Sequence, residues 1–160
     1  MLKSVYQIDL LQLKWPNDIY HKGKKLGGVL IETFVNNGKI NCIIGIGLNL
    51  LGSDDIEPYI NNSCTDLNKI TFKELSLNEL SAYLINSLYK GLKIFESKGF
   101  PAFADKWHEL DMLFNKEIKV KTNNGIIIGH AVGASEQGLK VCLSDGGATE
   151  LFDGEISLIK

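Results

Sequence analysis

Arginine is absent from this 160-residue sequence, and all 17 Lys and Arg positions are lysines. A lysine ammonium is a point charge, so the sequence excludes a bidentate guanidinium clamp on phosphate. Cysteine and histidine are scarce, with three of each. Neither shows CxxC spacing, a disulfide framework or a metal-ligand cluster. The sequence therefore predicts no metal site, and its scattered cysteines favour a reducing cytosol.

An excess of positive charge is also missing. The net charge is −2 and the pI is about 5.9, so nucleic acid is not an expected partner. The stretch Met1–Leu13 lacks both the uninterrupted apolar core of a signal peptide and the length of a membrane span. With 44% hydrophobic and 22% charged residues, we expect a globular cytoplasmic protein with no membrane partner.

The first of three zones favours β-structure. Residues Leu10–Trp15 form a predicted strand that Pro16 stops. Two apolar runs, Gly27–Val35 and Ile40–Leu50, flank Asn36-Asn37-Gly38. Asn-Gly between β-rich runs predicts a hairpin, because both residues readily take positive φ.

The second zone, from about Gly52 to Leu113, is a polar loop followed by helices. Ser76 and Glu79 form a capping-box pattern at the start of a long helix, which Gly99 and Pro101 end. Its predicted apolar stripe consists of Leu80, Tyr83, Leu84, Leu88, Leu92 and Phe95. A shorter helix with Phe103 and Trp107 follows.

The third zone, from Phe114 to Lys160, contains five short β-prone runs divided by turn signals, including Asn123-Asn124-Gly125. The runs are Ile118–Lys121, Ile126–Val132, Leu139–Leu143, Ala148–Phe152 and Ile156–Ile159. Five short strands in under fifty residues predict a small barrel. The chain is therefore expected to be an α+β unit followed by a β-barrel.

Three local patterns are candidates for chemistry. In Lys14-Trp15-Pro16-Asn17-Asp18 a strand ends in short polar side chains, which equally fits a capped turn. The second pattern is a lysine that enters a glycine-bearing strand, Lys25–Glu32. There Lys25 can neutralise an anion lying against backbone amides. Alternatively, Lys25 belongs to a solvated basic run and Gly27-Gly28 marks a bulge.

The third pattern is Gly45-Ile46-Gly47-Leu48-Asn49. Glycines at alternate positions share one face of a strand, where they would form a floor for a small planar ligand or make room for a helix. No helix with a GxGxxG pattern follows, so this is not a dinucleotide fingerprint. The predicted hairpin brings the second and third patterns side by side, with Asn17 and Asp18 just before them.

The strings KWPND, KLGGVLIE and GIGLN, in this order and at these separations, resemble the catalytic domain of biotin–protein ligases. The bacterial biotin–[acetyl-CoA-carboxylase] ligase is the closest type. The resemblance continues through the helices and ends at Asp153–Leu158, so it covers nearly the whole chain. It implies a partial class II synthetase-like mixed sheet with helices over residues 1–113, and a small SH3-like β-barrel over residues 114–160.

The resemblance implies ATP-dependent formation of biotinyl-5′-AMP with Mg²⁺, then transfer of biotin to a lysine of a biotin carboxyl carrier protein. Lys25 would be the catalytic residue, an ammonium that bridges carboxylate and phosphate oxygens. The residues implied to bind biotin are Lys25, Gly28, Val29, Gly45 and Gly47. Those implied to face the nucleotide or its metal are Asn17, Asp18, Asn49 and Glu155.

The sequence departs from the family pattern upstream of KWPND. Members carry, upstream of KWPND, a Ser-Thr-Asn biotin contact and a loop rich in Gly and Arg that folds over the adenylate, and neither string occurs here. We therefore expect a truncated catalytic domain whose activity requires a separately encoded N-terminal fragment or a homodimer. The alternatives are a catalytically inactive remnant and a module that binds biotin or the carrier protein.

Overall fold

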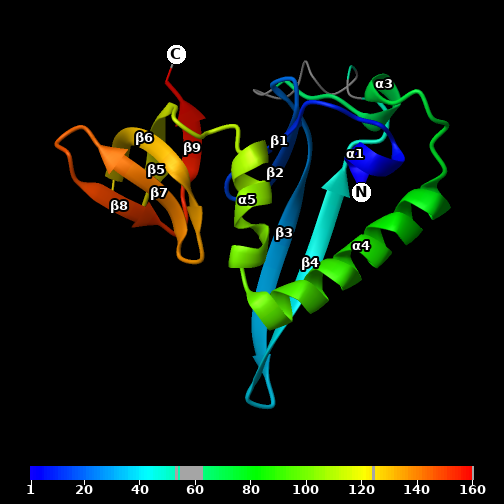
Figure 1. Cartoon of the computed structure of the whole chain (residues 1–160), viewed down its shortest axis with the longest axis horizontal. Helices are drawn as coiled ribbons and strands as arrows, with labels where there is room; N and C mark the ends of the chain where they lie inside the picture. The colour runs from blue at the N-terminus through cyan, green and yellow to red at the C-terminus, as the bar shows by residue number, and fades with distance from the viewer. Residues whose placement is uncertain (53, 55–62, 124, 160) are drawn as a thin grey trace. The chain divides into compact units, whose positions relative to one another are not determined.

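The computed structural model of the chain describes residues 1–52, 54, 63–123 and 125–159 (Figure 1). The chain divides into two compact units. The first comprises Met1–Gln12 and Asn17–Leu80, and the second Leu13–Pro16 and Ser81–Lys160. The expected division after Leu113 stays a prediction.

Along the chain, helices and strands occur in groups. They are α1 (Leu2–Val5), β1 (Leu11–Lys14), β2 (Asp18–His21), β3 (Lys24–Asn36), β4 (Lys39–Leu48), α3 (Leu67–Ile70), α4 (Leu77–Lys98), α5 (Pro101–Leu110), β5 (Glu117–Thr122), β6 (Gly125–Ser135), β7 (Gly138–Leu143), β8 (Ala148–Leu151) and β9 (Glu155–Leu158). Most of the polar loop predicted after Gly52 lies outside the described residues, and so does the turn residue Asn124.

The predicted hairpin is present as β3 and β4. The two strands pair antiparallel without interruption from Gly27 opposite Leu48 to Asn36 opposite Lys39. Asn37 and Gly38 form the turn with φ of 50° and 73°, which is the positive-φ pair that a tight two-residue hairpin requires. The sheet has the order β1-β2-β3-β4.

The long helix begins as its capping box predicts, with the Glu79 amide donating to Ser76 Oγ at 3.4 Å. Its apolar stripe is less buried than expected. Leu80 is the one buried residue of α4. The shorter helix is α5, and Pro101 occupies its first turn. Within the described part of the chain, no helix combines the length and the apolarity that a membrane crossing needs.

The five predicted barrel strands are also present. They form an antiparallel sheet in the order β8-β7-β6-β5-β9. Alternate side chains of these strands point inward, and the buried ones are Ile118, Val120, Ala131, Leu139, Val141, Leu151 and Ile156. The α+β architecture with a C-terminal SH3-like domain is therefore confirmed.

Candidate functional site

Three glycines leave part of one face of the β3–β4 hairpin without side chains. Gly28 lies opposite Gly47, and Gly45 lies opposite Leu30. Residues that lie opposite each other on paired strands share a face. A methyl group on Gly45 or Gly47 would come no closer than 3.8 Å to another part of the chain. Both glycines are exposed. The floor predicted from the alternating glycines is therefore an open surface.

Lys25 reaches this surface through a β-bulge. In a regular strand, residues three apart such as Lys25 and Gly28 would point to opposite faces. The pairing of β3 with β2 skips Leu26 between Gly27 and Lys25. A bulge of this kind shifts the alternation and redirects the side chains beyond it. The two interpretations of this segment, a bulge and an anion-binding lysine, are therefore compatible.

The ammonium of Lys25 lies beside the glycine face. Its Nζ is 2.6 Å from Asp18 Oδ1, and the two side chains are 42% and 22% exposed. Asp18 lies opposite Gly28 on the neighbouring strand. A methyl group on Gly28 would lie 3.0 Å from that carboxylate oxygen and 4.0 Å from Lys25 Cε. The ion pair therefore lies at the edge of the floor, where solvent and small ligands can reach it.

Two neighbouring titratable groups add little charge. Burial raises the pKa of Tyr20, and the negative charge of Asp18 raises it further. Burial also lowers the pKa of His21, and the positive charge of Lys22 lowers it further. Both side chains therefore favour their uncharged forms at neutral pH.

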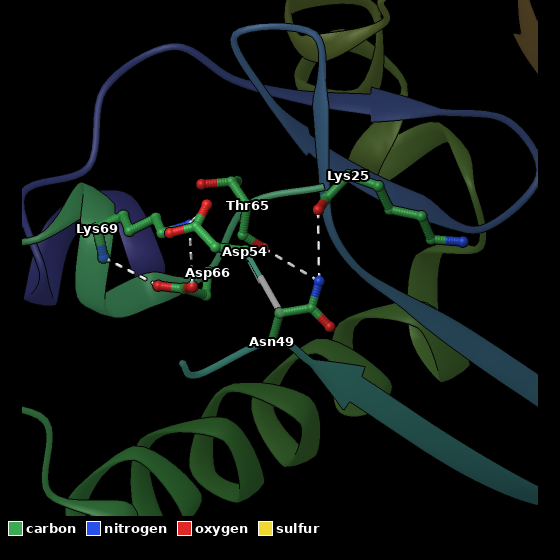
Figure 2. Close-up of polar contacts among 6 residues, drawn as sticks. All are labelled: Lys25, Asn49, Asp54, Thr65, Asp66 and Lys69. Atoms are coloured by element: carbon green, nitrogen blue, oxygen red, sulfur yellow. Dashed lines mark hydrogen bonds and ion pairs between the residues drawn. The ribbon is translucent and has the colours of Figure 1, made fainter. Parts of the chain in front are cut away.

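The main chain of Lys25 is held by a segment distant in sequence. Its amide donates to the Ser63 carbonyl at 3.0 Å, and its carbonyl accepts from the Thr65 amide at 2.9 Å. The Asn49 side-chain amide donates to the carbonyls of Lys25 and Thr65, at 3.4 Å and 3.1 Å. Figure 2 shows this amide between the two main-chain segments. The sequence predicted Asn49 at the site but not this bonding.

The segment that contacts Lys25 continues into a short, capped helix. Asp66 is 1% exposed, and its Oδ1 accepts from the Lys69 amide at the start of α3, at 3.0 Å. Lys69 Nζ lies 3.8 Å from Asp66 Oδ2 and 2.6 Å from Asp54. Asp66 just before Leu67 is an N-cap signal, so the helix was detectable from sequence. Its contact with Lys25 was not.

The remaining predicted residues are placed as follows. Asn17 contributes its carbonyl, which accepts from the Val29 amide at 2.8 Å. The Val29 side chain lies on the face opposite the glycines, because strand residues alternate. Glu155 is exposed in β9, opposite Lys121, and belongs to the second unit. All the other predicted site residues belong to the first unit.

The arrangement suits a small flat ligand that carries an anion. The bare surface of Gly28, Gly45 and Gly47 offers backbone contact, and Lys25 supplies the positive charge at its edge. Among the described residues, no group of three or more His, Cys, Asp or Glu side chains is placed to hold a metal ion. The ligand-binding roles of these residues stay predictions.

Known proteins match both the sequence and the fold. The profile of the Biotin/lipoate A/B protein ligase family matches residues 3–49, the stretch that contains every predicted site residue except Glu155. The Bifunctional ligase/repressor BirA of Escherichia coli is 32% identical over 151 residues, which are 94% of this chain and 47% of that protein. The Biotin--[acetyl-CoA-carboxylase] ligase of Mycobacterium tuberculosis is 25% identical over 86% of this chain and 48% of that protein.

Solved structures extend the match over the whole fold. The biotin protein ligase from Aquifex aeolicus superposes with a TM-score of 0.81 at 32% identity, covering 99% of this chain and 68% of that one. The same protein in complex with biotin and ATP gives a TM-score of 0.80 and covers 66% of that chain. This chain spans about half the length of the curated relatives it matches.

Proposed function

The chain belongs to the biotin protein ligase family, and from this premise we propose that it takes part in the ATP-dependent biotinylation of a carrier protein. In the first step, a carboxylate oxygen of biotin attacks the α-phosphorus of ATP and pyrophosphate leaves. In the second, the ε-amine of a carrier lysine attacks the acyl carbon of biotinyl-5′-AMP. AMP leaves, the amine loses a proton and an amide remains.

The observation that supports this proposal is the position of the Lys25 ammonium. It lies beside the bare Gly28 surface and is paired with Asp18 at 2.6 Å. Biotin's carboxylate and the α-phosphate repel each other as they approach. An ammonium between them offsets that repulsion and stabilises the charge that develops in the transition state. Lys25 is thus proposed as an electrostatic catalyst and not as a nucleophile.

The glycine floor is the proposed biotin site. Gly28, Gly45 and Gly47 leave room for a ring system to lie against the backbone, and Lys25 would meet the carboxylate at the end of the ligand. Val29 is also assigned to biotin, but only through its main chain, because its side chain lies on the opposite face of the strand. The solved relative from Aquifex aeolicus in complex with biotin and ATP is consistent with both ligands.

The proposed nucleotide side consists of Asn17, Asp18 and Asn49, all in the first unit. The nucleotide role expected for Glu155, which belongs to the second unit, stays a prediction. Mg²⁺ is usually held by substrate phosphates together with one or two carboxylates. Asp18 supplies one carboxylate beside the floor, so the residues present fit a magnesium ion that ATP brings with it. The ion would neutralise phosphate charge, while Asp18 would also keep Lys25 on the glycine face.

The proposed protein partners follow from the reaction and from the lack of arginine in the sequence. The proposed acceptor is the biotin carboxyl carrier protein of acetyl-CoA carboxylase, and the proposed location is the cytoplasm. Because the sequence contains no arginine, a triphosphate would meet no guanidinium from this chain. We propose that an arginine-bearing N-terminal ligase segment supplies this group. A second copy in a homodimer would complete the site without a guanidinium, because it also lacks arginine.

The missing guanidinium group also favours a second candidate function. Without it the chain would bind biotin or the carrier protein but would not make adenylate. Biotin titration by calorimetry in the absence of ATP measures this function directly. Heat of binding without any biotinyl-AMP under all conditions would support the binding module over the ligase.

The proposed ligase is tested by incubating the chain with biotin, α-labelled ATP and Mg²⁺, with and without an arginine-bearing N-terminal ligase segment. Biotinyl-AMP is the expected product. Lys25→Ala should slow its formation about 100- to 1000-fold, by analogy with the loss of one oxyanion-hole donor. Lys24→Ala is the matched control, since adjacent strand residues point to opposite faces. Equal rates for Lys25→Ala and the unmodified chain would contradict the assignment.

A further inference from the structure

We propose that Asn49 is a positioning residue for Lys25, which it serves by holding the main chain of that lysine. The proposal deepens the proposed function and rests on it, because the position of the Lys25 ammonium affects the reaction rate only if Lys25 is catalytic. It assigns to Asn49, beside its proposed place on the nucleotide side, a role that acts through another residue.

The side chain of Asn49 has both its amide hydrogens placed near main-chain acceptors. Nδ2 lies 3.1 Å from the Thr65 carbonyl and 3.4 Å from the Lys25 carbonyl, in a partly buried setting. These two carbonyls belong to segments about forty residues apart in sequence, which Asn49 joins (Figure 2). A primary amide has two N–H donors, so this pair of acceptors uses both.

The main chain of Asn49 is anchored as well. Its amide donates to the Leu26 carbonyl at 2.9 Å, and its own carbonyl accepts from the Leu67 amide at 2.9 Å. The residue therefore lies where the end of β4, the start of β3 and the segment before α3 meet. A side chain fixed at its base can hold the Lys25 carbonyl in place.

Fixing the Lys25 main chain matters because its side chain is long and half exposed. The bulge at Leu26 turns the side chain toward Gly28. Hydrogen bonds with Ser63, Thr65 and Asn49 hold Lys25 just beyond that bulge. A catalytic group displaced by about 1 Å can lose roughly 100-fold in rate. Loosening this end of β3 would let the ammonium leave the edge of the floor.

Aspartate is the informative substitution at this position. Asn49→Asp keeps the shape of the side chain but removes both donors, and it places carboxylate oxygens against two carbonyl oxygens. Asn41→Asp is the matched control. Asn41 lies in β4, and its side-chain amide also donates to a carbonyl, that of Lys39 at 3.1 Å, but on an exposed part of the hairpin.

The first measurement is amide hydrogen exchange by NMR, which requires no activity. Asn49→Asp should speed exchange of the Lys25 and Thr65 amides about tenfold, as expected for losing a hydrogen bond. The Val29 amide, bonded to Asn17 in the same unit, is the internal reference. Asn41→Asp should leave all three rates unchanged. If Asn49→Asp does not fold, Asn49→Ser, which keeps one donor, is measured in its place.

The second measurement is the rate of biotinyl-AMP formation with the complementing segment present. Asn49→Ser should lower kcat at least tenfold, because a positioning residue changes an interaction made in the transition state. In a Lys25→Ala background the same change should cause no further loss. A residue with a merely structural role would lower both backgrounds equally.

The outcomes separate the two proposals. Unchanged exchange at Lys25 and Thr65, or a raised KM for ATP with kcat preserved, would overturn the positioning role and favour direct nucleotide contact. Faster exchange at these amides together with full activity of Lys25→Ala would refute the proposed function instead. In that case the contact between Asn49 and the lysine main chain would stand without a catalytic purpose.

Discussion

Lys25 Nζ lies 2.6 Å from Asp18 Oδ1, and this ion pair joins the KWPND and KLGG strings of the sequence. The pair has a partly exposed lysine and a less exposed aspartate, so water screens their attraction. Its value lies in geometry rather than in stability. Asp18 is opposite Gly28, so the carboxylate keeps the ammonium beside the glycine surface.

Asp18→Asn should therefore affect catalysis more than folding. Loss of an exposed ion pair costs about 1 kcal/mol or less, whereas a displaced Lys25 ammonium can lower the rate of adenylate formation by up to roughly 100-fold. Urea unfolding and the labelled-ATP assay measure the two effects. Glu96→Gln, which breaks the exposed pair with Lys93 in α4, is the control and should change neither. A large stability loss without a rate effect would refute this role.

Two glycines of the hairpin should respond differently to alanine. A methyl group on Gly27 would overlap the Gly47 carbonyl oxygen, so Gly27→Ala should destabilise the fold by about 1–3 kcal/mol. Space above Gly47 is open, so Gly47→Ala should fold normally and weaken biotin binding roughly tenfold or more. Calorimetric titration and thermal denaturation separate the two. Unchanged biotin affinity in Gly47→Ala would exclude this surface as the floor.

Asp111 should make stability depend on pH. Burial raises the pKa of this carboxyl group, and the hydrogen bond from the Leu113 amide offsets part of the effect. A raised folded-state pKa means that the protonated form stabilises the fold below the unfolded pKa of 3.8. This stabilisation is lost as pH rises through the folded value. The charged form is thus the costly one at neutral pH.

Asp111→Asn, which stays neutral, should gain stability relative to the unmodified chain between about pH 4 and about pH 7. Urea unfolding of both proteins at several pH values gives the difference directly. Asp105→Asn, an exposed carboxylate in α5, is the control for a general charge effect. A stability difference that is constant or falls over this range would show that burial of Asp111 is not the cause.

Alanine should destabilise the fold at a glycine of the hairpin turn and stabilise it at a glycine of the long helix. Gly38 has φ of 73°, so Gly38→Ala should cost about 1–2 kcal/mol. Gly91 lies inside α4 with open space around it, so Gly91→Ala should gain about 0.5–1 kcal/mol. Thermal denaturation of the two variants is the measurement. Equal destabilisation by both would mean that added volume, and not backbone conformation, sets the effect.

The elements that sequence predicted well are those specified by neighbouring residues. Asn37-Gly38 encodes its own turn, Ser76 and Glu79 encode a helix start, and alternating apolar residues encode the five strands of the second unit. Strand β2 (Asp18–His21) was not predicted. It has four residues, follows a proline and an asparagine, and is defined by its pairing with β3, which no local pattern reveals.

The candidate site shows the same limit. The glycine floor follows from strand alternation, which is a local rule. The contacts of Lys25 with Ser63 and Thr65 cross some forty residues, and the sequence between offers no signal for them. Asn49 was predicted at the site, but its bonds to main-chain carbonyls depend on that distant segment and could not be predicted.

The bulge at Leu26 makes the site depend on a count of residues. With one residue fewer between Lys25 and Gly28, an uninterrupted ladder would put both on one side without any bulge; with the present count, only the skipped pairing achieves it. Point substitutions at Leu26 therefore preserve the parity, whereas a deletion that keeps the bulge reverses it. A one-residue deletion in this short stretch keeps Lys25 and Gly28 on one side only if the bulge is lost with it.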